Sequence, residues 1–157
     1  MLYQPYDYKV GENGLGTKEG LTELCTEAHQ YGVKIIVDVV ANHTNGSLSY
    51  VASFWQDQSL YHDYQGGIDY SNRWQVTHGR LGMWDLKTED SRVQEKIKEY
   101  VAELKSCGVD GIRWDAAKHI GLPSKAILSG RMCPTRRCTT MVRFLMELVV
   151  MILCPKR

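Results

Sequence analysis

The sequence predicts an α/β fold with parallel strands, because an amphipathic helix is followed directly by an apolar strand at two places along the chain. The first helix and strand cover residues 17–40, and the second cover residues 91–115. A helix that leads straight into a buried strand is half of a βαβ unit. With 157 residues, the chain can bury one ordinary core and is too short for a large two-domain enzyme.

Residues 17–31 are expected to form the first helix. Apolar residues recur there at helical spacing, at Leu21, Leu24, Cys25 and Ala28. Thr17 is a suitable N-cap, and Gly32 would end the helix. The nearly unbroken β-branched run over residues 33–40 is typical of a parallel strand that is covered on both faces.

The second helix is predicted over residues 91–107, and Gly108 would end it. One face carries apolar side chains at Val93, Ile97, Tyr100, Val101 and Leu104. A strand is predicted next, over residues 109–115. Between the two pairs, residues 44–88 are rich in aromatic, Gly, Asn, Asp and Gln residues and show no sustained period. A structureless loop of that length is uncommon in a compact domain, so we expect an irregular subdomain inserted after the first strand.

The composition is that of a soluble globular protein, with 43% apolar and 24% charged residues. The formal net charge of +1 gives no general attraction to nucleic acid or to membranes. The chain opens without the basic cluster and apolar run of a signal peptide. Its longest apolar run, residues 141–153, contains two charged residues and is shorter than the roughly 20 residues that span a bilayer. We therefore expect a soluble chain with no membrane or nucleic-acid partner, and its cellular compartment stays open.

Charge and composition change sharply near residue 124. Residues 1–124 carry 12 basic and 17 acidic side chains, whereas residues 125–157 carry 7 basic and 1 acidic. Three of the five cysteines, but only one of the aromatic residues, lie in this second stretch. Such a step indicates a boundary. Cys25 and Cys107 stand alone in the predicted helices and are expected to be reduced and buried.

Polar residues interrupt or follow the first predicted strand. Asp38 lies inside an apolar run, where an unpaired buried carboxylate is costly, so it must meet a partner or lie at a strand end. Asn42 and His43 follow within one short turn. The carboxyl ends of parallel strands form the active face of such folds. An aspartate that caps a loop beside a surface histidine is an equally good explanation for this strand alone.

The second strand makes a functional site the better explanation. Arg113 and Asp115 are two residues apart, so their side chains point to the same side of the strand. A fixed cation keeps a neighbouring carboxylate ionised and available as a nucleophile or a charge stabiliser. Lys118 and His119 add polar groups just beyond the strand end. A purely structural ion pair between Arg113 and Asp115 remains the alternative.

Two ordered segments carry a resemblance to a known family. DVVANH at residues 38–43 and GIRWDAAKH at residues 111–119 resemble the first and second signature segments of the alpha-amylase family of retaining glycoside hydrolases. The sequences leading into both segments are also similar to that family, so the resemblance covers roughly residues 3–124. It implies part of a (β/α)8 TIM barrel, with strands 3 and 4 and their helices, and an irregular domain B insertion.

The resemblance also implies a domain organisation. Residues 1–43 would hold barrel helix 2 and strand 3, and residues 44–88 would be the domain B insertion. Residues 89–124 would hold barrel helix 3 and strand 4. By the same resemblance, the partner would be an α-glucan such as starch or a maltooligosaccharide.

The resemblance assigns roles to particular residues. Asp115 would be the nucleophile and Arg113 its electrostatic partner. His43 would hydrogen-bond the sugar, Lys118 and His119 would line the subsite on the leaving-group side, and Asp38 would lie at the same sugar-binding rim. Asn42, Asp85 and the backbone carbonyl of His119 would be Ca²⁺ ligands, which agrees with the preference of Ca²⁺ for oxygen. Several aromatic residues of the insertion would either stack on glucose rings or, more often, pack its core: Trp55, Tyr61, Tyr64, Tyr70, Trp74 and Trp84.

One required group is not identified. A retaining glycosidase needs a second carboxyl as the general acid, and the only acidic residue after Asp115 is Glu147, in an unrelated apolar setting. We interpret residues 125–157 as a frameshifted, non-native tail. Loss of one guanine at the codon before Lys125 converts a family-like continuation into the observed residues, and the restored frame permits a Gly-Glu pair about where the family carries its acid. The nucleotide sequence around codon 125 tests this interpretation.

Three classes of function follow from these observations. The first is an alpha-amylase-type hydrolase fragment, weakly active or inactive alone, whose open barrel edges would favour self-association. The second is a non-catalytic module that binds calcium or oligosaccharide. The third is a nucleic-acid protein that acts through the basic tail, which has too few arginines for a convincing patch. The exact glucan, and whether attack is internal or from chain ends, stay open.

Overall fold

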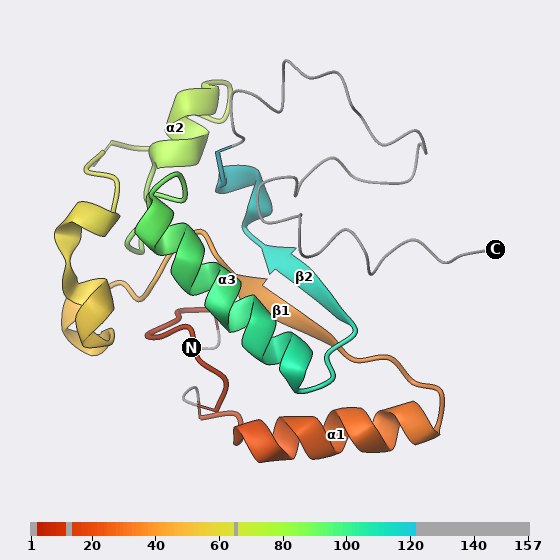
Figure 1. Ribbon diagram of the computed structural model, residues 1–157. Coiled ribbons are helices and arrows are strands. Elements are labelled where there is room, and N and C mark those ends of the chain that lie inside the picture. Colours follow the sequence, from red (N-terminus) through yellow and green to blue (C-terminus); the bar gives the residue numbers. More distant parts are fainter. Residues whose placement is uncertain (1–2, 12–13, 65, 122–157) are drawn as a thin grey trace.

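The computed structural model describes residues 3–11, 14–64 and 66–121. Within them lie three α-helices and two strands, shown in Figure 1. In chain order these are α1 (Lys18–Gln30), β1 (Ile36–Val40), α2 (Arg73–His78), α3 (Ser91–Ser106) and β2 (Gly111–Asp115). Four short 3-10 helices complete the set: η1 (Leu48–Tyr50), η2 (Ser53–Gln56), η3 (Gln58–Leu60) and η4 (Ala117–His119). The predicted tail over residues 125–157 lies outside the described residues.

The two strands pair in parallel and form a βαβ unit with α3. The register sets Ile36 opposite Gly111 and Val40 opposite Asp115. Figure 1 shows α3 lying across the pair, so the chain crosses from β1 to β2 through the insertion and this helix. The helix–strand order predicted from the sequence is therefore confirmed. Because the strands are parallel, their carboxyl ends meet at one edge.

Successive residues of each strand point to opposite faces of the pair. Val39 packs in an apolar cluster with Cys25 and Leu104, and Ile112 and Trp114 lie against the same cluster. The other face is open at its start within the described residues, where Ile36 is 62% exposed, but it is covered at Val40, which is buried. The expectation of a strand covered on both faces is thus met in full on one face only, because the described helices cover only that face.

Helix α1 has the ends that its sequence predicts. The Thr17 hydroxyl accepts a hydrogen bond from the Gly20 amide at 3.1 Å. The chain leaves the helix through Gly32 at φ +69°, a left-handed conformation that favours glycine. Its expected apolar face is only partly covered by the described residues, since Cys25 is buried and Leu24 is 53% exposed.

Helix α3 carries the larger buried face. Its N-cap Asp90 accepts from the Arg92 amide at 2.8 Å. The residues expected on its apolar face are buried at Val93, Ile97, Val101 and Leu104. The helix ends before Gly108, whose φ is +94° and where an added Cβ would lie 3.1 Å from the Cys25 Cβ. The helix can therefore approach α1 closely at this point. Cys25 and Cys107 are both free and buried, as expected.

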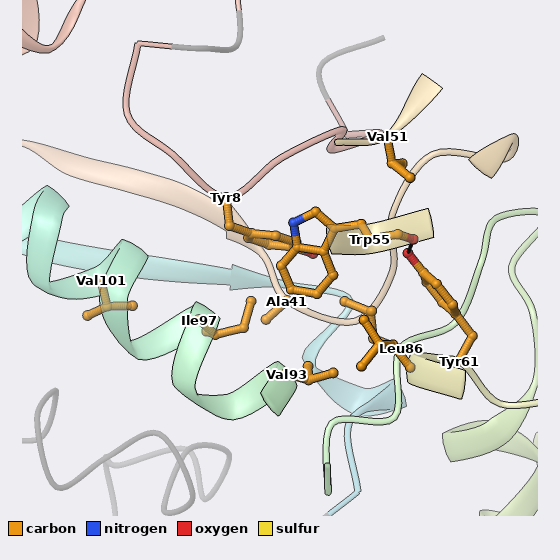
Figure 2. Packing of buried hydrophobic residues seen from close by; sticks show 10 residues of the cluster. Tyr8, Ala41, Val51, Trp55, Tyr61, Leu86, Val93, Ile97 and Val101 are labelled. Carbon is orange, nitrogen blue, oxygen red and sulfur yellow. Dashed lines mark hydrogen bonds between the residues drawn. The ribbon is translucent and has the colours of Figure 1, made fainter. Parts of the chain in front are cut away.

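Residues 44–88 contain only short elements among those described, namely η1 to η3 and α2. Their core is aromatic: Trp55 and Tyr61 are almost fully buried. The Trp55 ring lies 4.8 Å from that of Tyr8, centroid to centroid, and its indole N–H donates to Asp7 Oδ1 at 3.0 Å. Figure 2 shows these rings packed over Ile97 of α3. The insertion is thus anchored to both the N-terminal segment and the βαβ unit.

The N-terminal segment is held by Glu103 of α3. Its Oε2 accepts from the Val10 amide at 3.0 Å, and its Oε1 pairs with Lys18 Nζ at 2.9 Å. The Val10 hydrogen bond, followed by the Lys18 contact, lowers the pKa of the Glu103 carboxyl. None of the helices in the described part of the chain is long and apolar enough to cross a membrane.

We expect Glu103→Gln to lower the free energy of unfolding by about 1 kcal/mol at pH 7, because a charged acceptor is replaced by a neutral one at a half-exposed site. Because folding lowers the pKa of this carboxyl, ionised Glu103 stabilises the fold at pH values above its unfolded-state pKa, near 4.3. This contribution is lost as the pH falls through the folded-state pKa. Urea unfolding should therefore separate the two proteins by more at pH 7 than at pH 3. Glu99→Gln, on the exposed side of α3, is the control, and an equal loss there would contradict the assignment.

Candidate active site

The polar residues expected on the two strands lie together on the open face of the pair. Asp38 is directly opposite Arg113 in the register, and Asp115 ends the second strand. Arg113 Nη1 lies 2.7 Å from Asp38 Oδ2, and Arg113 Nη2 lies 3.6 Å from Asp115 Oδ1. One guanidinium therefore lies between two carboxylates contributed by neighbouring strands.

The two contacts of Arg113 differ in kind. The contact with Asp38 is a short charge-assisted hydrogen bond, and it is the main reason why the pKa of Arg113 is raised. The contact with Asp115 is too long for a hydrogen bond, so it acts through charge alone. The ion pair between Arg113 and Asp115 that was considered from the sequence is present at 3.6 Å, and Arg113 makes a shorter one with Asp38. This arrangement leaves the Asp115 carboxylate, 26% exposed, next to a cation but without a close bond from it.

Tyr3 joins this group, and sequence analysis did not single it out. Its hydroxyl donates to Asp38 Oδ2 at 2.8 Å, and this hydrogen bond raises the pKa of Tyr3. Its backbone carbonyl lies 3.1 Å from His43 Nε2. The residue is 35 positions from Asp38, so no local pattern could have indicated the contact.

His43 lies at the centre of the expected site residues and is almost fully buried. Burial lowers the pKa of its imidazole, and the charges of Asp115 and Asp85 only partly oppose that effect. A neutral ring that donates from Nε2 to Tyr3 leaves a lone pair on Nδ1. That nitrogen is buried and has no hydrogen-bond partner among the described residues. An imidazole with a free acceptor can take a hydrogen bond from a ligand hydroxyl.

Asn42 and Asp85, predicted as metal ligands, are brought into direct contact. Both are almost fully buried, and Asn42 Nδ2 donates to Asp85 Oδ1 at 2.9 Å. Their segments are held side by side, since the Leu86 amide donates to the Asn42 carbonyl at 2.8 Å. The second carboxylate oxygen of Asp85 lies 2.7 Å from His62 Nδ1.

The electrostatics of this pair favour an added cation. Burial raises the pKa of the Asp85 carboxyl, and hydrogen bonds from His62 and Asn42 offset only part of that rise. For His62, burial opposes the charged form, but hydrogen bonds to Asp85 and Glu89 outweigh it and raise the pKa. The Asn42 amide donates through its nitrogen, so its oxygen remains as a ligand. This oxygen and the Asp85 carboxylate fit a hard cation such as Ca²⁺.

The residues after β2 form a tight turn at the strand end. Ala116 adopts φ +50°, a left-handed conformation that costs a non-glycine residue about 1–2 kcal/mol. Lys118 Nζ lies 4.5 Å from the centre of the Tyr70 ring, and the Lys118 carbonyl accepts from Arg73. His119 is buried, and its Nδ1 bonds the Val76 carbonyl at 2.7 Å. The turn is thus tied to the insertion on both sides.

Sequence analysis missed two further residues that shape the site. His62 orients Asp85, and Arg73 holds the turn through the carbonyls of Lys118 and Ile120. His62 stands in the irregular segment YHDY, where only its type marked it as able to bond a carboxylate. Arg73 opens a short helix and carries no such signal.

Comparison with known proteins places this arrangement in a family. Residues 1–80 match the model of the alpha amylase catalytic domain. An alpha-amylase of Clostridium acetobutylicum is 42% identical over 126 residues, covering 76% of this chain and 17% of that protein. An alpha-amylase structure from Malbranchea cinnamomea shows 32% identity and a TM-score of 0.65, with 76% of this chain and 28% of that chain covered. The maltohexaose complex of alpha-amylase I from Eisenia fetida shows 26% identity and a TM-score of 0.63, with 76% and 28% covered.

The chain spans less than a third of the length of each of these relatives. The fold predicted through the resemblance is confirmed: the parallel βαβ unit is part of a (β/α)8 barrel. The family-model match includes residues 38–43, the first of the two segments on which the resemblance rested. This protein belongs to the alpha-amylase family of glycoside hydrolases.

Proposed function

We propose that this chain carries the nucleophile of a retaining glycoside hydrolase that cleaves α-1,4-glucosidic bonds in starch-like glucans. The observation that carries the proposal is the position of Arg113 between Asp38 and Asp115, on the open face of the strand pair. Its relatives are alpha-amylases, and one of them was solved with maltohexaose. A carboxylate next to a fixed cation stays ionised at neutral pH and can attack carbon.

In this proposal, Asp115 bonds to the anomeric carbon and forms a glycosyl–enzyme intermediate. Arg113 places its positive charge beside Asp115, while Asp38 and Tyr3 hold the guanidinium in place. His43 hydrogen-bonds a sugar hydroxyl at the same rim. Lys118 and His119 line the leaving-group side of the same rim.

The proton for the leaving oxygen must come from a second carboxyl. Residues 116–121, the described residues that follow Asp115, contain neither Asp nor Glu. We therefore expect the 157-residue chain to release no reducing sugar from starch.

We further propose that residues 44–88 act as a domain B that Ca²⁺ fastens to the barrel, with Asn42, Asp85 and the His119 carbonyl as ligands. Bound Ca²⁺ would supply positive charge to the buried carboxylate. Asp85 comes from the end of the insertion and Asn42 from the end of β1, so the pair already joins the two parts. His119 ends η4, just after β2, so in this proposal its carbonyl would link the second strand to the same ion.

The nucleophile can be tested without the missing acid. In α-maltosyl fluoride the leaving group departs as fluoride and needs no proton, so attack by Asp115 breaks the C–F bond and forms a C–O bond. Without a base to activate water, the adduct should accumulate. We expect intact-mass and peptide mass spectrometry to find one maltosyl group on the peptide that contains Asp115.

Asp115→Asn should form no adduct, whereas Asp57→Asn, an exposed carboxylate changed in the same way, should label like the unmodified chain. Labelling of Asp115→Asn, or none in the unmodified chain, would refute the assignment. Release of reducing sugar from starch by the unmodified chain would show that another residue supplies the proton.

A non-catalytic binding module is the second candidate. It is favoured by the Asn42–Asp85–His62 group, which is complete and buried, whereas no general acid follows Asp115 among the described residues. Calorimetric titration with Ca²⁺ and with maltohexaose separates the two candidates. Binding of both without an adduct from the fluoride would support the module.

A further inference from the structure

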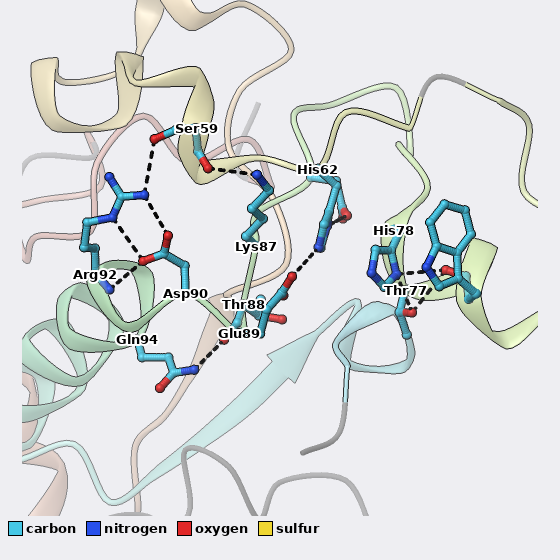
Figure 3. A network of polar contacts seen from close by, with 12 residues as sticks. Ser59, His62, Thr77, His78, Lys87, Thr88, Glu89, Asp90, Arg92 and Gln94 are labelled. Atoms are coloured by element: carbon cyan, nitrogen blue, oxygen red, sulfur yellow. Dashed lines mark hydrogen bonds and ion pairs between the residues drawn. The ribbon is translucent and has the colours of Figure 1, made fainter. Parts of the chain in front are cut away.

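A second group of ligand atoms lies beside Asp85. One nitrogen each from His62 and His78 and a carboxylate oxygen of Glu89 all lie within 4.8 Å of one another. His62 follows η3, His78 ends α2, and Glu89 precedes the N-cap of α3. Figure 3 shows the three side chains arriving from these separate segments. Three segments thus converge on a single point.

The hydrogen bonds of both histidines fix which ring nitrogen is available. His78 Nδ1 lies 3.0 Å from the Trp74 carbonyl and 2.9 Å from the Thr77 hydroxyl. His62 Nδ1 lies 2.7 Å from Asp85 Oδ2. The Trp74 carbonyl holds the hydrogen of His78 on Nδ1, so Nε2 of that ring is left with a lone pair. His62 faces a carboxylate through each ring nitrogen, so a metal ion at its Nε2 would take the place of the proton that it shares with Glu89. Carboxylate–histidine pairs of this kind commonly orient metal-binding imidazoles.

The contact between His62 and Glu89 calls for a cation. His62 Nε2 lies 2.9 Å from Glu89 Oε1, and both atoms are electron-pair donors when the ring hydrogen is on Nδ1. Two donors this close repel unless a proton or a metal ion lies between them. The ring centroids of His62 and His78 are 4.2 Å apart, which brings a third donor to the same place.

We propose that His62, His78 and Glu89 form a Zn²⁺ site. Imidazole nitrogen suits Zn²⁺ and related transition metals, whereas Ca²⁺ and Mg²⁺ prefer oxygen. Two histidines and a glutamate with a water in the fourth position are a known Zn²⁺ ligand set. The Glu89 side chain is 63% exposed, so the open position faces solvent.

Binding requires only a modest adjustment. Zn–N distances of about 2.0–2.1 Å put the ligand atoms of a tetrahedral site roughly 3.4 Å apart. Among the described residues, Glu89 bonds His62 and its side chain is exposed, so it can move to close the remaining gap. The ion would then link η3, α2 and the start of α3. This site needs no glucan and stands whether or not Ca²⁺ binds at Asn42 and Asp85.

The test is a Zn²⁺ titration of the full 157-residue chain after removal of metals with a chelator. Excess Ca²⁺ is present throughout, so that oxygen-only sites are filled, and accessible thiols are alkylated so that cysteines do not bind Zn²⁺. We expect one Zn²⁺ per chain by calorimetry and by competition with a chromogenic chelator. Glu89→Gln and His78→Gln should each weaken Zn²⁺ binding at least tenfold. Mutation of a residue that only hydrogen-bonds to a metal ligand already lowers metal affinity by about 10–100-fold.

His29→Gln is the matched control. His29 Nε2 lies 2.7 Å from Asp110 Oδ2, so these residues form a similar histidine–carboxylate pair. Among the described residues, no second imidazole joins this pair to form a group of metal ligands. It should leave the Zn²⁺ affinity unchanged. Glu89→Gln removes an exposed charge and should fold normally, so a loss of binding there reports on the site itself. If the unmodified chain binds no Zn²⁺, or both variants bind it as tightly as the unmodified chain, the site is a hydrogen-bonded cluster and the proposal is wrong.

Discussion

Trp55→Ala is expected to lower the free energy of unfolding by about 3–5 kcal/mol, the usual cost of emptying a buried aromatic site. Trp55 is 1% exposed, packs against the rings of Tyr8 and Phe54, and donates its indole N–H to Asp7. Its removal opens a cavity between the N-terminal segment and the insertion, and it leaves Asp7 Oδ1 with only its hydrogen bond from the Tyr8 amide. A loss of this size is a large part of the stability of any small domain.

Urea unfolding followed by circular dichroism measures the effect. Trp74→Ala is the control, because Trp74 has the same side chain but is 53% exposed, and it should cost about 1 kcal/mol or less. A similar loss in both variants would mean that burial of Trp55 does not hold the insertion in place. A shift confined to Trp55→Ala would show that the aromatic cluster is the main link between residues 7–8 and the insertion.

The helices and their ends could be predicted from the sequence because their signals are local. Thr17 caps α1 three residues from the amide that it binds, and Gly32 and Gly108 each follow the helix that they end. The same is true of the strands, whose apolar runs mark them directly. The predicted strand over residues 33–40 begins later, at Ile36, because only residues 36–40 pair with β2.

Contacts between distant residues could not be read from the sequence. The spacing of Arg113 and Asp115 indicated a shared face, but not that the shorter bond of Arg113 goes to Asp38 on the neighbouring strand. That preference depends on the register between β1 and β2, which only the folded pair defines. Burial of α1 likewise depends on what packs against it, so its periodicity did not show that Leu24 is exposed.

The candidate site was predictable to the extent that its residues lie in the two signature segments. Asn42 and Asp85 were expected to act together through the resemblance, and the structure brings them into contact. Tyr3 and His62 come from segments without a period or motif, so only the fold shows that they hold Asp38 and Asp85. The polar groups that orient a site therefore remain the least accessible to sequence reasoning.

Asp85→Asn is expected to weaken Ca²⁺ binding by about 100-fold or more, equivalent to about 2.7 kcal/mol, because it removes the only charge among the proposed ligands. The same change should also destabilise the chain when Ca²⁺ is absent. Asp85 Oδ1 accepts from Asn42, and Oδ2 accepts from His62. An asparagine has one acceptor and one donor group, so its NH₂ faces a donor unless the Asn42 amide turns over or the His62 ring hydrogen moves to Nε2.

That mismatch is buried, since Asp85 is 1% exposed, and should cost about 1–3 kcal/mol. Calorimetry with Ca²⁺ measures the first effect, and urea unfolding with and without Ca²⁺ measures the second. Asp57→Asn changes an exposed carboxylate in the same way and should alter neither. If Asp85→Asn bound Ca²⁺ normally but still lost stability, the buried carboxylate would serve the hydrogen bonds of Asn42 and His62 and not a metal. Its position between the strand end and the insertion would then be explained by those two bonds alone.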